Sequence, residues 1–119
     1  MYRGAVAQAI RGRRGQAFLR EMLASMDSLP ERKLIAGELQ DKSGAVCAIG
    51  SVGASRGLDM SHLNYCENSE AVASFFGIAR SLAAEIEFIN DDDFHFSTSE
   101  TAERRFERVW KWVEENIKE

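Results

Sequence analysis

The stretch from Gly44 to Gly57 constrains the fold of this chain most, because its sequence, GAVCAIGSVGASRG, is almost free of charge and bulk. Arg56 is the one charged residue in it. Its small residues let other backbone segments approach closely, and Val46, Ile49 and Val52 recur at helical spacing. We therefore predict a tightly packed central helix over this stretch, ended by Gly57, with the longer side chains of the rest of the chain packed around it.

The length and composition describe a single domain. The chain has 119 residues, enough for one domain that buries roughly two thirds of the surface exposed by its unfolded chain. Its hydrophobic share of 45% and charged share of 29% are typical of ordinary globular proteins. No apolar run is long enough to span a bilayer, and Gln8 and Arg11 interrupt the N-terminus before a secretory signal forms. We therefore expect a cytoplasmic protein with no membrane partner.

The net charge of −4 conceals a division between the N-terminus and the rest of the chain. Residues 1–20 contain five arginines and no acid, so they carry +5, whereas 21–119 carry −9. We accordingly divide the chain into a basic arm over 1–14 and a helical domain over 15–119. Such an arm can bind a phosphate backbone, an acidic protein surface or a second copy of the chain, or stay mobile without a partner. The binding candidates in the arm are Arg11, Arg13 and Arg14.

The first third of the chain predicts two helices. Apolar residues recur at intervals of three and four over 15–26, behind an Arg-Gly-Arg-Arg-Gly segment too rich in glycine to hold one conformation. The segment 28–31, which contains Pro30, can end this helix and start another. Residues 33–39 suit either a short helix, which we favour, or one side of a small hairpin that turns at 41–44.

The second half of the chain predicts three further helices. One begins near Ser69 and ends at Gly77, and the next runs from Ile78 to Asn90. The acidic run 91–93 would be unfavourable at the negative end of that helix and therefore marks a loop.

The last helix carries the clearest pattern. Ser97 and Glu100 have the spacing of a capping box, and an apolar stripe follows them. The stripe consists of Ala102, Phe106, Val109, Trp110, Val113 and Ile117. The predicted fold is a mainly α-helical single domain, a compact bundle of five or six helices with at most one small β-hairpin.

Cys47 is the one candidate catalytic nucleophile. A thiol at the start of a helix can have a lowered pKa, and His62 or His95 would have to serve as its base. Free cysteines are also among the most buried residues, and we favour a packing role for Cys47. A domain with its own core predicts reduced thiols at Cys47 and Cys66, with one disulfide left open.

The metal and cofactor signals are weak. His62 and Cys66 are four residues apart, and Asp91, Asp93 and His95 alternate, but neither pattern is a known zinc signature. The weak metal candidates are His62, Cys66 and His95. The glycines of the 44–57 stretch lack the Lys-Ser or Lys-Thr of a phosphate loop. We therefore expect no metal and no cofactor.

The two tryptophans predict a second binding surface. Trp110 and Trp112 point in different directions because they are two residues apart on a helix. Trp110 lies on the apolar stripe, so Trp112 is either exposed near Arg108 or packed under a loop. Exposed Trp and Arg are frequent at binding hot spots. The acidic candidates Asp91, Asp92 and Asp93 would imitate phosphates toward a basic host protein.

Several segments together resemble a group of small uncharacterised proteins of bacteria and their phages. These are GRRGQAFLREML at 12–23, VCAIG followed by ASRG within 46–57, and a helix that ends in Asn90-Asp91 before a helix containing tryptophan. The group has no assigned activity, so the resemblance transfers no site residues. It implies a phage or prophage accessory protein that binds and blocks a host macromolecule, as anti-CRISPR and other counter-defence proteins do.

These observations favour a binding protein over an enzyme, because no arrangement of residues points to a reaction. We expect a host protein as the partner, since a body of −9 would repel nucleic acid beyond the arm. The alternatives are a cysteine-dependent enzyme that uses Cys47 and a nucleic-acid-binding protein that uses the arm. The arm could also dock on a second copy and form a homodimer.

Overall fold

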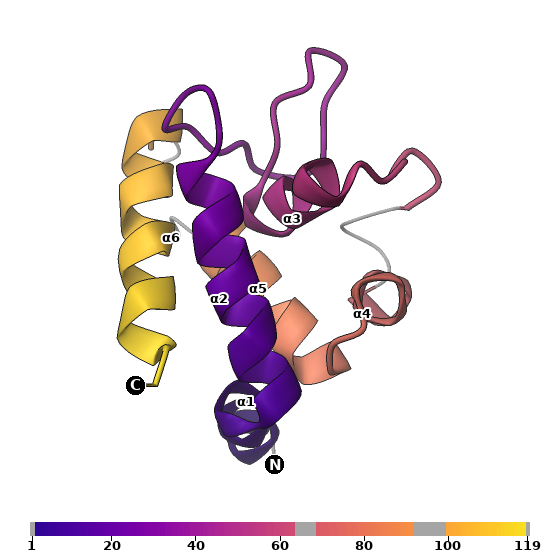
Figure 1. Cartoon of the computed structure of the whole chain (residues 1–119), viewed down its shortest axis with the longest axis vertical. Coiled ribbons are helices and arrows are strands. Elements are labelled where there is room, and N and C mark those ends of the chain that lie inside the picture. Colours follow the sequence, from indigo (N-terminus) through magenta and orange to yellow (C-terminus); the bar gives the residue numbers. More distant parts are fainter. Residues whose placement is uncertain (1, 64–68, 92–99, 119) are drawn as a thin grey trace.

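The structure is a computed structural model, and it describes residues 2–63, 69–91 and 100–118. These residues form six α-helices, which confirms the predicted mainly α-helical bundle. The helices are α1 (Tyr2–Arg11), α2 (Arg13–Asp27), α3 (Ala48–Arg56), α4 (Ser69–Phe76), α5 (Arg80–Asp91) and α6 (Ala102–Asn116). In Figure 1, α2 and α6 lie side by side, α5 passes behind α2, and α1 lies across the lower end of α2.

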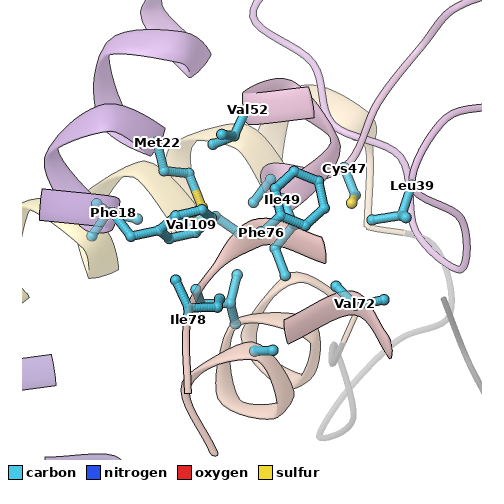
Figure 2. Packing of buried hydrophobic residues seen from close by; sticks show 14 of the residues in the cluster. Phe18, Met22, Leu39, Cys47, Ile49, Val52, Val72, Phe76, Ile78 and Val109 are labelled. Carbon is cyan, nitrogen blue, oxygen red and sulfur yellow. The ribbon is translucent and has the colours of Figure 1, made fainter. Parts of the chain in front are cut away.

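The core lies between α2, α3, α4, α5 and α6. Side chains from these helices meet in one apolar cluster, part of which Figure 2 shows. Its fully buried members include Leu19, Met22, Ile49, Val52, Val72, Leu82, Ile86, Phe106, Val109 and Val113. Three residues of the predicted α6 stripe are therefore in the core, and Trp110 packs against it at the edge.

Helix α3 forms within the stretch predicted to be a central helix, but it is shorter than 44–57 and packs mainly against α2 and α5. It begins after Cys47 and ends at Gly57, whose φ of 72° is the expected left-handed cap. Gly44 has a φ of 93° and belongs to the preceding turn. Close backbone approach is confirmed at Gly50, because a Cβ atom there would lie 1.9 Å from the carbonyl oxygen of Leu39.

The favoured helix over 33–39 is wrong. This segment is irregular, and its Ile35 and Leu39 exchange backbone hydrogen bonds with Val46 and Cys47. The next residue, Gln40, forms an isolated antiparallel bridge with Val46. Gly37 has a φ of 83°, which interrupts any helix here. The Asp41 carboxylate accepts hydrogen bonds from the backbone N–H groups of Ser43 and Ala45 and so closes the turn. The alternative prediction, a small hairpin, therefore describes this region better than a helix does. The helix expected to start at 28–31 does not form.

The N-terminal segment is helical rather than flexible. Helix α1 packs against α2 and α5, and the chain turns sharply at Gly12. Gly15 allows this turn, because a Cβ atom there would lie 1.8 Å from the carbonyl oxygen of Ala9. Gly12 and Gly15, which predicted a flexible segment, therefore permit close packing of α1 and α2.

The predicted capping box at the start of α6 is wrong. The cap is Thr101, whose side-chain oxygen accepts a hydrogen bond from the N–H of Arg104 at 3.1 Å. Ser97 lies outside the described residues. Glu100 pairs instead with Arg108 at 2.7 Å and with Arg105 at 3.6 Å, and the Arg108 hydrogen bond holds the pKa of Glu100 below its ordinary value.

Asn90, at the end of α5, joins three parts of the fold. Its side chain is fully buried, accepts a hydrogen bond from the N–H of Ala48 at 3.0 Å and donates one to the carbonyl of Ile35 at 2.9 Å. The backbone carbonyl of Asn90 accepts a hydrogen bond from Nε of the buried Arg105. The start of α3, the 34–35 segment and α6 are therefore all tied to one residue.

We expect Gly50→Ala to destabilise the protein by about 3 kcal/mol, the upper end of the usual cost of overpacking. The new methyl group would meet the backbone of Leu39, which cannot move aside without shifting the bridge at Gln40. Urea unfolding followed by circular dichroism measures this change. The control is Gly4→Ala, an exposed site in α1 with nothing near the new methyl group, where we expect about 0.5–1 kcal/mol of stabilisation. Equal effects of the two variants would contradict the close approach.

We expect Asn90→Ala to lower the free energy of unfolding by roughly 2–3 kcal/mol, because it leaves the buried N–H of Ala48 and the partly buried carbonyl of Ile35 without their hydrogen-bond partner. The exposed Gln40→Ala serves as the control and should change stability by less than about 0.5 kcal/mol. Both values come from the same urea titration. A loss below about 1 kcal/mol for Asn90→Ala would show that these hydrogen bonds contribute little net stability.

Candidate functional site

Arg11, Arg13 and Arg14 form an exposed cluster, the cationic corner, where α1 turns into α2. Arg11 occupies the last turn of α1, where the helix dipole favours a cation. Arg13 and Arg14 are the first two residues of α2, where the dipole disfavours one. Two of the three arginines therefore occupy positions that do not benefit the stability of the helix.

The cationic corner differs in its contacts from several other basic groups of the protein. Within the described part of the chain, none of its three side chains makes a hydrogen bond or an ion pair. Several basic side chains elsewhere pair with acids, among them Arg32, Lys33, Arg56, Arg105 and Arg108. The Arg56 guanidinium, for example, lowers the pKa of Glu21 through a hydrogen bond. The corner thus presents concentrated positive charge that the fold does not neutralise.

A groove runs beside the cationic corner between α1 and α5. Its volume is about 590 Å³. The residues that line this α1–α5 groove are Val6, Ala7, Ile10, Arg11, Glu85, Phe88 and Asn116. Phe88 is 51% exposed, and it is the one large hydrophobic residue that is exposed among those the structure describes. Arg11 belongs to both features, so the cationic corner and the apolar groove form one continuous surface.

Gln16 fixes the backbone behind this surface. Its side-chain nitrogen donates hydrogen bonds to the carbonyls of Ile10 at 2.7 Å and Asn116 at 2.9 Å. Its side-chain oxygen accepts a hydrogen bond from the N–H of Lys118 at 2.7 Å. Gln16 is itself buried, so it holds the end of α1 and the end of α6 together beneath the groove.

Arg108 and Trp112 do not form an exposed patch together. Arg108 is held by Glu100 and by the carbonyls of Ile89 and Asn90. Trp112 is partly buried and packs against the core. Both side chains therefore have structural contacts in the bundle.

The acidic candidates are only partly described. Asp91 is the last residue of α5, and its carboxylate accepts hydrogen bonds from the N–H of Gly37 at 3.3 Å and from Asn90 at 2.8 Å. Asp92 and Asp93 lie outside the described residues, and so do the metal candidates Cys66 and His95. His62 is exposed and packs edge-on against the ring of Phe75. No group of three potential metal ligands occurs within 2–63, 69–91 and 100–118.

Cys47 occupies the N-cap of α3, but burial determines the pKa and the accessibility of its thiol. The side chain is fully buried, and its Sγ accepts a hydrogen bond from the N–H of Gly50 at 3.3 Å. Burial raises the pKa of the thiol to about 12. The suggested lowering by the helix N-terminus is therefore wrong, because the loss of solvation outweighs it. A neutral, inaccessible thiol agrees with the packing role.

We expect Cys47 to resist thiol reagents in the folded protein. In a Cys66→Ser variant Cys47 is the only thiol, and its reaction with dithionitrobenzoate at pH 8 should be at least about 100-fold slower than that of free cysteine, because only the exposed thiolate reacts. The rate should reach that of free cysteine in urea, which serves as the control. Rapid labelling in the folded state would contradict the buried position and revive the nucleophile hypothesis.

The comparisons with known proteins give no relative from which a site could be transferred. The chain matches no protein family, no curated protein and no solved structure. None of the helices in the described ranges is long and apolar enough to cross a membrane. The cationic corner and the α1–α5 groove are therefore the features from which function is inferred.

Sequence reasoning identified the three arginines but missed the groove. Phe88 carries a signal that was available, because it lies two residues after Ile86 and so about 200° away from the buried face of α5. A phenylalanine on the opposite side of an amphipathic helix indicates a second contact surface. Without α1 beside it, however, the pattern does not show that this surface is a groove.

Proposed function

We propose that the protein acts by binding another protein through the cationic corner and the α1–α5 groove, and not by catalysis. The observation that carries this proposal is the group of three exposed arginines, which have no partner among residues 2–63, 69–91 and 100–118, beside the exposed Phe88. Arginine and aromatic side chains are enriched at binding hot spots. Charge without an internal partner, next to apolar surface, is the combination that a complementary protein would cover.

Several features favour a protein over nucleic acid as the partner. A nucleic-acid site combines cations with phosphates or stacked bases, whereas the wall beside Arg11 contains the aliphatic residues Val6 and Ile10. Residues 21–119 carry −9, so a duplex would be repelled beyond the corner.

The resemblance to small proteins of bacteria and phages supports the biological part of the proposal. In this proposal the protein is a cytoplasmic accessory protein of a phage or prophage that binds and blocks a host protein, as a counter-defence inhibitor of the anti-CRISPR kind does. A buried, reduced Cys47 agrees with a reducing compartment. A homodimer formed through the basic N-terminal segment is a second arrangement that the same surface would support.

We expect the triple variant Arg11→Glu, Arg13→Glu, Arg14→Glu to lose its protein partner. Affinity capture from a bacterial lysate, with the immobilised wild-type protein and both variants run in parallel, measures this loss by quantitative mass spectrometry. The matched control is Arg80→Glu, Arg104→Glu, Lys111→Glu, which changes the net charge equally at exposed positions elsewhere. A protein captured by the wild type and the control, but at least tenfold depleted with the corner variant, supports the proposal.

Binding to mixed-sequence duplex DNA at two salt concentrations provides the opposing test. Tight binding that weakens steeply with salt and disappears in the corner variant would replace the protein partner with nucleic acid. A lysate in which no protein distinguishes the wild type from the corner variant would overturn the proposal as well. Circular dichroism of both triple variants confirms that neither change unfolds the bundle.

A further inference from the structure

We infer that the α1–α5 groove and the cationic corner together recognise an acidic amphipathic segment of the partner protein. An apolar side chain of that segment would sit against Ile10 and Phe88, while its carboxylates would contact Arg11, Arg13 and Arg14. This inference rests on the proposed function and adds the chemistry of the partner. It makes the arginines and the groove a single recognition surface.

The dimensions of the groove fit a bulky side chain. Its volume of about 590 Å³ lies within the range of roughly 300–1,000 Å³ that small-molecule pockets have. Val6 is only 8% exposed and forms its floor, with Ala7 and Ile10 beside it on α1 and Phe88 on the opposite wall. Covering the exposed ring of Phe88 with another apolar side chain would remove apolar surface from water, which favours binding.

The charges determine which amphipathic segment fits. Arg11 lines the groove, and Arg13 and Arg14 are two and three residues further along the chain, so their Cα atoms lie within roughly 7–11 Å of that of Arg11. Carboxylates pair with guanidinium groups through two parallel hydrogen bonds, and such pairs are among the strong polar contacts in proteins. Because the three arginines have no acidic partner within the described part of the chain, no existing ion pair has to break when a carboxylate binds.

Glu85 gives the groove a direction. It lies on the α5 wall, whereas Arg11 lies on the α1 wall, so the two walls carry opposite charges. A carboxylate of the partner is attracted toward the three arginines of the corner, which lie at the α1 side of the groove. The acidic end of the bound segment should therefore face the α1–α2 turn, and its apolar or basic side should face α5.

Selection from a random dodecapeptide library, displayed on phage and offered to the immobilised full-length protein, tests this chemistry directly. The triple corner variant serves for counter-selection. We expect the enriched peptides to contain at least two acidic residues close to a Leu, Phe or Trp. Enrichment of peptides without acidic residues, or of no peptide at all, would overturn the inference.

Fluorescence anisotropy with the best-enriched peptide then separates the groove from the corner. Phe88→Ser removes the exposed ring without changing charge, and Arg11→Ala removes one cation. Each should weaken binding at least tenfold, whereas the control Arg80→Ala, at an exposed position at the start of α5, should leave it unchanged. Replacing the acidic residues of the peptide by Asn and Gln should weaken binding similarly. Binding that is unaffected by Phe88→Ser would show that the groove is not used.

A second copy of the chain or nucleic acid on this surface would give different experimental results from an acidic peptide. If the wild-type protein is a dimer in solution that Phe88→Ser dissociates, a second copy fills the groove and the inference is overturned. Displacement of the peptide by mixed-sequence duplex DNA would assign the corner to phosphates instead. If lysate capture depends on the corner arginines but not on Phe88, the proposed function stands and this inference fails.

Discussion

The buried side chain of Asn90 is the interaction on which the arrangement of the helices depends. It satisfies the first N–H of α3 and the carbonyl of Ile35, while its backbone carbonyl receives Arg105. Helix ends leave backbone groups without partners, and burying them costs stability unless another group satisfies them. Because Asn90 alone supplies hydrogen-bond partners to three segments, the irregular 33–47 region can lie against the bundle without a helix or sheet of its own. Arg105 and Glu100 extend the same network to the start of α6.

Most of the helices could be predicted from the sequence because their apolar spacing matches the faces that are buried. Helix α6 is the clearest case, with Phe106, Val109 and Val113 in the core as the stripe indicated. Two of the errors, at 33–39 and at the N-terminal segment, came from glycine, whose two uses look alike in a sequence. Gly15 and Gly50 serve close backbone contact, whereas Gly37 serves a positive φ. Only the tertiary partner, the carbonyl of Ala9 or of Leu39, tells these uses apart.

The positive charge of the candidate site could be predicted from the sequence, but the α1–α5 groove could not. The cluster of Arg11, Arg13 and Arg14 is visible in the sequence, and its lack of partners in the described part of the chain agrees with the proposed binding role. The groove requires α1 to be a helix packed on α5, which depends on contacts between residues about 80 positions apart. The burial of Trp112 could not be predicted for a similar reason, because it depends on neighbours that helical periodicity does not reveal.

The hydrogen bonds of Gln16 would affect the rate at which the proposed partner binds. By bonding Ile10, Asn116 and Lys118, it fixes the backbone of the corner before any partner arrives. A preorganised surface loses little backbone entropy on association, so only the exposed arginine side chains would have to be ordered. Steering by their positive charge would accelerate the encounter with an acidic partner. Residence time would instead be controlled by the apolar contact at Phe88, since short-range contacts mainly set dissociation rates.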